Sequence, residues 1–134
     1  MSTKAIFSPD APNPPPFLTQ AMTFGNMVFC SGQVAIDPKT GALVQGSIGD
    51  RTSRILQNLS AVLKAAGSSL DNAVKLNIYV TNLKDFNAVN EVYITFFPGT
   101  KPARTCVGVA KLPLGTDVEI ECTAVKSISA VGRL

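Results

Sequence analysis

The residues of this chain that are best suited to chemistry lie in its last third. Arg104 opens a strand-like run over residues 104–110, and two carboxylates, Glu119 and Glu121, lie in a second such run over residues 117–125. Side chains on a strand alternate between its two faces, so the two glutamates share one face of the second run. If the two runs pair, an arginine and a carboxylate flank one small hollow, which is a plausible place to hold an anionic substrate.

Each of these charged groups has a chemical and a structural interpretation. The guanidinium of Arg104 offers a planar fork that binds a carboxylate by two charge-assisted hydrogen bonds. Alternatively, Arg104 forms an ion pair with Glu119 or Glu121 that only ties two strands together. One glutamate is suited to position or deprotonate a water molecule in a poorly hydrated cleft, and the other to neutralise a cation at an interface.

The composition excludes several classes of function. The chain has 134 residues and no histidine, which excludes zinc sites of the usual kind, Ser-His or Cys-His catalysis, and ribonuclease chemistry by paired histidines. The net charge is +3 with no cluster of basic residues, so no nucleic-acid tract is predicted, and no apolar run is long enough to span a membrane. Apolar residues make up 46% of the chain and charged residues 16%, which indicates that another subunit covers part of the surface.

The three cysteines have no paired spacing, so we expect reduced thiols in an intracellular protein. We predict that Cys30 and Cys122 lie in the core. Cys106 is expected to line a pocket rather than to act as a nucleophile, because no histidine is present to activate it.

The hydrophobic pattern predicts two helices and a strand in the middle of the chain. A helix is expected over residues 50–66, with Asp50 as N-cap and Gly67 just past its C-terminal end. Alternation over residues 74–80 predicts a strand. A second helix is expected from an Asn82 cap to about Phe97, with Asn90 on or beside its packing stripe.

The N-terminal third contains mainly turn signals. The proline-rich segment over residues 8–17 is interpreted as an ordered arm or a loop over a pocket, the alternative being a mobile leader. Residues 27–32 predict a buried strand that ends at a turn formed by Ser31 and Gly32, and DPKTG over residues 37–41 predicts a turn. The expected order of strands, helix, strand, helix and two strands favours an α+β fold: a mixed sheet with helices on one face.

We expect one domain over residues 1–134, with an arm over 1–17 and a frayed tail over 127–134. The cytoplasm is the default location because no mitochondrial leader is obvious. The final Gly-Arg-Leu resembles the Ser-Lys-Leu peroxisomal signal in part.

Four segments together resemble one known family. They are SGQVAIDPKTGALV, LQNLSAVLKAAGSSLDNAVKLNIYV, DFNAVNEVYITFF and, above all, PARTCVGVAKLPLGTDVEIE. Across roughly residues 4–126 the chain resembles the RidA family, also called YjgF/YER057c/UK114 or endoribonuclease L-PSP. The resemblance implies a chorismate-mutase-like (bacillus-type) fold and a homotrimer with sites at its subunit interfaces. It also implies deaminase activity on reactive enamines and imines such as 2-aminoacrylate, giving 2-keto acids and ammonia, with no cofactor or metal.

The resemblance also implies roles for individual residues. By that similarity Arg104 binds the substrate carboxylate and Glu119 is linked to the attacking water. The remaining substrate-binding positions that match the family pattern are Ser31, Gly32, Asn90 and Cys106. Position 17 departs from it: the active members usually have Gly-Pro-Tyr where this chain has Pro15-Pro16-Phe17, so the ring is kept and the hydroxyl is lost. Phe17 is still expected among the substrate-binding residues, where it closes the mouth of the pocket, the alternative being that it packs at the subunit interface.

Two other functions are carried as alternatives. The older family name indicates a ribonuclease or a translation inhibitor. The lack of histidine and of a basic tract argues against this function. The second alternative is a trimer without enzymatic activity that binds small carboxylates or acts like a chaperone. In that case Phe17 would indicate a family member that has lost turnover.

Overall fold

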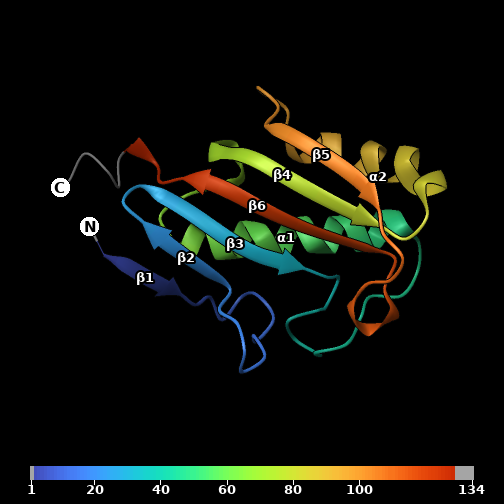
Figure 1. The fold of residues 1–134 in the computed structure, drawn as a ribbon, viewed down its shortest axis with the longest axis horizontal. Coiled ribbons are helices and arrows are strands. Elements are labelled where there is room, and N and C mark those ends of the chain that lie inside the picture. Colours follow the sequence, from blue (N-terminus) through green and yellow to red (C-terminus); the bar gives the residue numbers. More distant parts are fainter. Residues whose placement is uncertain (1, 129–134) are drawn as a thin grey trace.

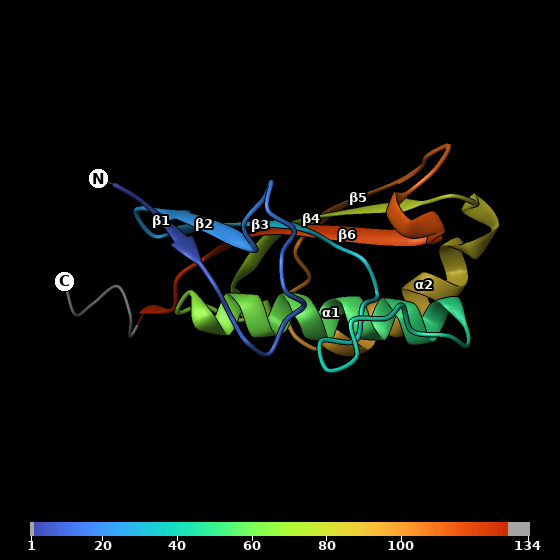
Figure 2. The same cartoon turned by 90° about the horizontal axis from the view of Figure 1, so that it is seen from below.

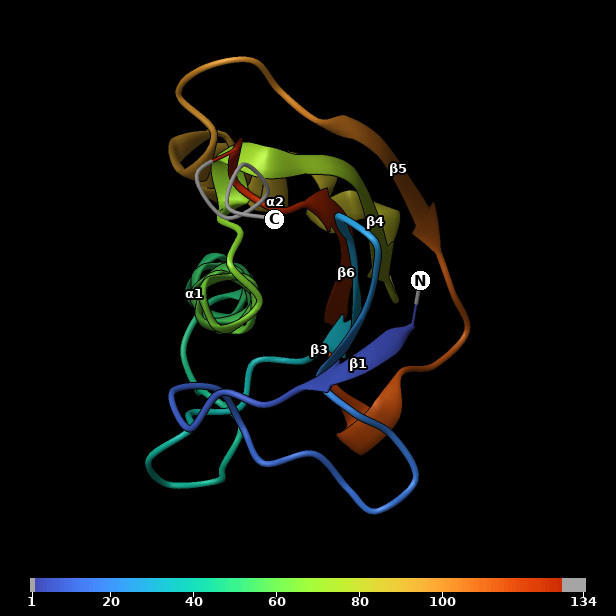
Figure 3. The same cartoon turned by 90° about the vertical axis from the view of Figure 1, so that its left-hand side faces the viewer.

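The architecture is a six-stranded mixed sheet with helices packed on one face, as expected from the sequence. It was established from a computed structural model that describes residues 2–128 (Figure 1). The strands are β1 (Thr3–Ile6), β2 (Ala21–Phe24), β3 (Met27–Gln33), β4 (Ala73–Val80), β5 (Ala103–Gly108) and β6 (Val118–Val125), and the two α-helices are α1 (Ile48–Ala65) and α2 (Phe86–Tyr93). Both helices lie on the same side of the curved sheet (Figures 2 and 3).

The strand order is β1-β2-β3-β6-β4-β5. Only the β4–β5 pair is parallel, and every other neighbouring pair is antiparallel. The expected pairing of the two C-terminal runs is therefore wrong, because β4 lies between β5 and β6. A parallel β4–β5 pair requires a crossover, and α2 supplies it.

Helix α1 packs its apolar stripe against the sheet, and its ends are well defined. The stripe is fully buried and consists of Ile55, Leu56, Leu59, Val62 and Leu63. The N-cap is Ser47 rather than Asp50, because Asp50 is the third residue of the helix and closes a capping box with Ser47. Gly67, with φ +78°, ends the helix in a Schellman motif, as its position past the helix predicted.

The second helical segment is shorter than the sequence pattern indicated. A 3₁₀ turn over Leu83–Asp85, capped by the side chain of Asn82, leads into α2, and another over Ile94–Phe96 follows it. Two short strands, β1 and β2, escaped prediction because four-residue strands carry too little alternation.

The loop between β3 and α1 contains the predicted DPKTG turn. The side chain of Asp37 accepts from the backbone of Lys39, and Gly41 adopts φ +75°. Of the expected frayed tail, Ser127 is hydrogen-bonded to Gly67 and Asn72, and residues 129–134 lie outside the described residues. Within residues 2–128 we find no helix with the length and apolarity needed to cross a bilayer.

Candidate functional site

The seven residues singled out from the sequence form two groups on opposite faces of the sheet. Arg104 is in register with Leu76, whose side chain is buried under the helices, so Arg104 points to the helical face. Glu119 is in register with Tyr79 on the other face, because its neighbour Ile120 is buried on the helical side. One chain therefore does not bring Arg104 and Glu119 into a common hollow, contrary to the expectation from strand pairing.

The first group lines a cavity of about 560 Å³ at the end of β3. Glu119 contributes its side chain from β6, and the proline-rich arm and the 3₁₀ turn over Pro113–Gly115 form the walls. Four of the expected site residues meet here: Phe17, Ser31, Gly32 and Glu119. The arm is thus an ordered pocket wall and not a mobile leader.

Ser31 and Gly32 form a β-bulge within β3 rather than the predicted turn. Cys30 pairs with Cys122 and Gln33 with Ile120, so two residues of β3 oppose the single Glu121 of β6. A bulge re-aims the side chains around it, which brings this end of β3 against the arm. The hydroxyl of Ser31 donates to the carbonyl of Thr19 at 2.6 Å.

Glu119 lies directly on Gly32. A side-chain carbon at position 32 would collide with Oε2 of Glu119 and approach its Cδ to 3.0 Å. Glycine is therefore required at this position for the glutamate to keep its place, and this is a physical reason for the Ser-Gly sequence.

The environments of Glu119 and Glu121 separate their roles. Glu121 accepts a hydrogen bond from the hydroxyl of Tyr79 and another from the amide of Asn77. Glu119 has neither a hydrogen bond nor an ion pair with the side chains of residues 2–128. Burial raises the pKa of the Glu119 carboxyl, and the nearby charge of Glu121 raises this pKa further. Glu119 is thus the carboxylate suited to exchange a proton with a ligand or water.

Gln20, which the sequence analysis missed, holds the arm in place. Its buried side chain accepts from the backbone of Ser8 at 2.6 Å and donates to the carbonyls of Ser8 and Pro12. Prolines lack backbone donors, so a buried amide that bonds to carbonyls within the segment is needed to fix its path. A polar residue just before the apolar Ala21 is the only signal that the sequence offered.

The second group lies between β5 and α2 and consists of Arg104, Cys106 and Asn90. The guanidinium carbon of Arg104 lies 4.8 Å from the ring centre of Tyr93 and 5.4 Å from that of Phe86. Arg104 has no carboxylate partner among residues 2–128, so the alternative of an ion pair with Glu119 or Glu121 does not hold within one chain.

Two buried polar atoms of α2, Oδ1 of Asn90 and the hydroxyl of Tyr93, have no hydrogen-bond partner among residues 2–128. Burial raises the pKa of the Cys106 thiol, although the charge of Arg104 opposes this effect. The thiol is therefore protonated at neutral pH, which disfavours a nucleophilic role. Cys30 and Cys122 are buried free thiols, as predicted.

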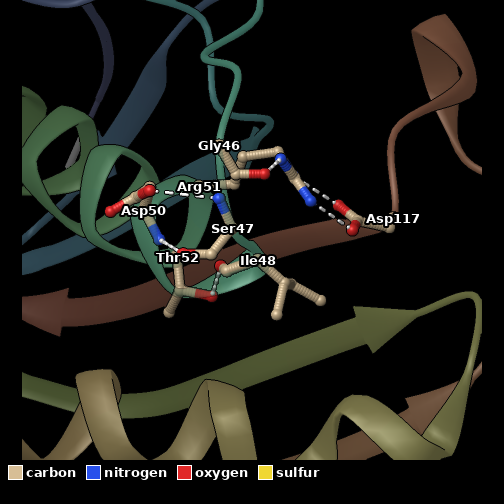
Figure 4. A network of polar contacts seen from close by, with 7 residues as sticks. All are labelled: Gly46, Ser47, Ile48, Asp50, Arg51, Thr52 and Asp117. Atoms are coloured by element: carbon tan, nitrogen blue, oxygen red, sulfur yellow. Dashed lines mark hydrogen bonds and ion pairs between the residues drawn. The ribbon is translucent and has the colours of Figure 1, made fainter.

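A network at the start of α1 anchors the turn that walls the first cavity (Figure 4). Arg51 donates to both carboxylate oxygens of Asp117, at 2.8 and 2.7 Å, and to the carbonyl of Gly46 at 2.9 Å. Asp117 stands two residues before Glu119 and two residues after Gly115, the last residue of the turn over Pro113–Gly115. The ion pair thus fastens the wall of the cavity to α1.

The fold and the two groups define a small α+β protein that presents an arginine and a separate carboxylate, each without an ionic partner among residues 2–128. The family model described as endoribonuclease L-PSP matches residues 9–126. The chain belongs to this family, the RidA/YjgF family anticipated from its motifs.

Individual relatives agree with this assignment. The chain is 44% identical to a RutC family protein of Pyrococcus horikoshii, over 92% of this chain and 98% of the relative. It is 42% identical to the chloroplastic Reactive Intermediate Deaminase A of Arabidopsis thaliana, over 79% of this chain and 57% of the relative. The crystal structure of Escherichia coli TdcF with bound serine superposes with a TM-score of 0.88 at 38% identity, covering 92% and 99% of the two chains.

Proposed function

We propose that the protein is a deaminase that hydrolyses reactive 2-imino acids, of the type that 2-aminoacrylate forms, to 2-keto acids and ammonia. The proposal rests mainly on one observation: neither Arg104 nor Glu119 has an ionic partner among residues 2–128. Unpaired, partly buried charges are costly in a folded chain unless they serve a ligand. The naming of one relative as a reactive intermediate deaminase gives independent support.

The complete site needs two copies of the chain. Arg104, Cys106 and Asn90 of one copy would face the cavity that contains Glu119, Gly32 and Phe17 of the next, as in the homotrimer that the family resemblance implies. Exposed apolar side chains on the sheet face without helices support self-association, because water would otherwise cover them. They include Phe24 and Phe29, which are 48% and 47% exposed.

In this site Arg104 binds the carboxylate of the imino acid by charge-assisted hydrogen bonds. Glu119 orients a water molecule and takes its proton, and the water oxygen bonds to the imine carbon while the C=N electron pair moves to nitrogen. Glu119 then passes that proton to the nitrogen, which gives the carbinolamine. The hydroxyl proton of the carbinolamine is transferred to the nitrogen through Glu119, the C–N bond breaks, and ammonia leaves with the keto acid as the other product. The reaction is a hydrolysis without a change in redox state. Positioning and one proton relay suffice because the imine is already activated.

The test generates the imine in situ with an amino-acid oxidase or a dehydratase and follows its decay with and without the protein. We expect faster decay with the wild type and none of this acceleration with Arg104→Ala or Glu119→Gln. Arg54→Ala, which removes a partly exposed arginine from α1, is the matched control and should remain active. Unchanged decay with the wild type, or full activity in Arg104→Ala, would contradict the proposal.

A carboxylate-binding protein without turnover is the second candidate, and Phe17 favours it. The ring of Phe17 lines the cavity and is 83% exposed, but it offers no hydroxyl to a ligand. Bound serine in the TdcF structure supports a small polar ligand in the family. Binding of a 2-keto acid with no effect on imine decay would select this second function.

A further inference from the structure

The guanidinium of Arg104 rests against two aromatic rings of α2. Phe86 and Tyr93 are seven residues apart, which is two helical turns, so they project from the same side of the helix. The guanidinium carbon lies within 6 Å of both ring centres, the range in which a cation is attracted to a ring face.

The ring of Tyr93 is packed against a second ring, and the turn before Phe86 lies close to β5. The ring of Tyr93 is buried and lies 4.7 Å from that of Phe97, measured between the ring centres. At the other end of α2, a side-chain carbon at Gly108 of β5 would come within 3.2 Å of Cγ of Leu83. The absence of a side chain at Gly108 therefore allows the turn before Phe86 to lie directly on β5.

A guanidinium held against ring faces keeps its in-plane N–H groups available for a carboxylate. None of these groups donates to another side chain within the part of the chain that the structure describes. An arginine side chain carries about 2 kcal/mol of rotamer entropy. Contacts that hold the side chain before the ligand arrives reduce the ordering cost of binding.

We propose that Phe86 and Tyr93 are positioning residues of the carboxylate site: their rings hold the Arg104 guanidinium in its binding orientation before the ligand enters. The inference rests on the proposed function of Arg104 and extends it, because it places determinants of carboxylate affinity on α2. These rings touch the arginine and not the reacting atoms.

The first measurement uses NMR of the whole protein in solution without ligand. The side-chain N–H resonances of Arg104, assigned with Arg104→Lys, should be displaced upfield by the ring currents. In Phe86→Leu this displacement should shrink, and in Phe86→Tyr it should persist. Phe86 is 40% exposed, so its replacement should leave the fold intact. Phe7→Leu removes a ring that is 57% exposed and that follows β1, at the opposite edge of the sheet from β5, and serves as the control.

The second measurement is the dissociation constant for 2-oxobutanoate. We expect it to rise about three- to tenfold in Phe86→Leu, as loss of one cation–π contact implies. Phe86→Tyr should restore the affinity. With an imine substrate the same change should appear in KM with kcat largely retained, a division that general destabilisation does not produce.

The two proposals fail in different ways. If the wild type binds no carboxylate, the proposed function of the site is overturned, and the ring-current displacement alone decides whether the rings hold Arg104. If the wild type binds 2-oxobutanoate through Arg104 but Phe86→Leu binds it equally well, the positioning role is overturned and the proposed function stands. Arg104 resonances that are identical in Phe86→Leu and the wild type also overturn the positioning role.

Discussion

Two arginines of this chain occupy opposite electrostatic situations. Arg51 donates to both oxygens of Asp117 and to a backbone carbonyl, and this partly buried pair joins α1 to the start of β6. Arg104 has aromatic rings around it and no carboxylate partner among residues 2–128. The same contrast separates Asp117, which has an ionic partner, from Glu119 two residues later, which has none among residues 2–128. The Arg51–Asp117 pair joins elements of the fold, whereas we propose that Arg104 and Glu119 serve a ligand.

We expect the largest effect from Gly32→Ala, which disturbs Glu119, the carboxylate without an ionic partner among residues 2–128. The added carbon would collide with the carboxylate of Glu119 and displace it. Misplacement of a catalytic group by about 1 Å can cost on the order of 10²-fold in rate, so we expect a fall in kcat of that order. The melting temperature should change little, because the backbone at position 32 does not require positive φ. Wild-type kcat in this variant would show that Glu119 is not held there for catalysis.

For the Arg51–Asp117 ion pair, we expect Arg51→Met to lower the stability of the fold without changing the rate of imine hydrolysis. Loss of a bidentate, partly buried ion pair should lower the free energy of unfolding by about 1–2 kcal/mol in chemical denaturation. Lys4→Met removes an exposed cation from β1 and should change this free energy by less than about 0.5 kcal/mol. A variant as stable as the wild type would remove the structural role assigned to the Arg51–Asp117 pair.

The smallest effects are expected in the pH dependence of stability, with opposite signs for the two carboxylates. The guanidinium of Arg51 lowers the pKa of Asp117, so its contribution is present at neutral pH and is lost as pH falls through the lowered pKa. Burial raises the pKa of Glu119, so stability falls as pH rises from the ordinary pKa through the raised value.

In thermal unfolding at neutral pH, Asp117→Asn should therefore be less stable than the wild type and Glu119→Gln more stable. Both differences should shrink near pH 4, where unfolded carboxyl groups begin to be protonated, roughly at their ordinary pKa. Shifts of the same sign in the two variants would contradict the contrast between the carboxylates.

The sequence pattern predicted the long elements better than the way they assemble. The α1 stripe, the alternation along β4 and the role of Gly67 were visible because they are local and periodic. The position of β4 between β5 and β6 could not be predicted from the sequence pattern. Strand order depends on how the crossover packs, and it affects neither the hydrophobic periodicity nor the composition of the strands. The four-residue β1 and β2 were missed for lack of length.

The candidate site, like the fold, could be predicted from the sequence only in part. Chemical type alone marked Arg104 and a glutamate as candidates, and the family motif selected Glu119 over Glu121. The physical basis of that selection, the hydrogen bonds of Tyr79 and Asn77 to Glu121, appears only when β4 and β6 are paired in register. The anchoring role of Gln20 depends on a loop path that no local pattern encodes.

The central claim is that Arg104 of one copy acts with Glu119 of another. It is tested most directly by unfolding equal amounts of Arg104→Ala and Glu119→Gln together, refolding the mixture, and measuring imine decay. Each variant refolded alone should be inactive. Random assembly of a symmetric oligomer gives an intact arginine and an intact glutamate at about one quarter of the interfaces, so the mixture should recover roughly a quarter of wild-type activity. A mixture as inactive as its two components would contradict a site shared between copies.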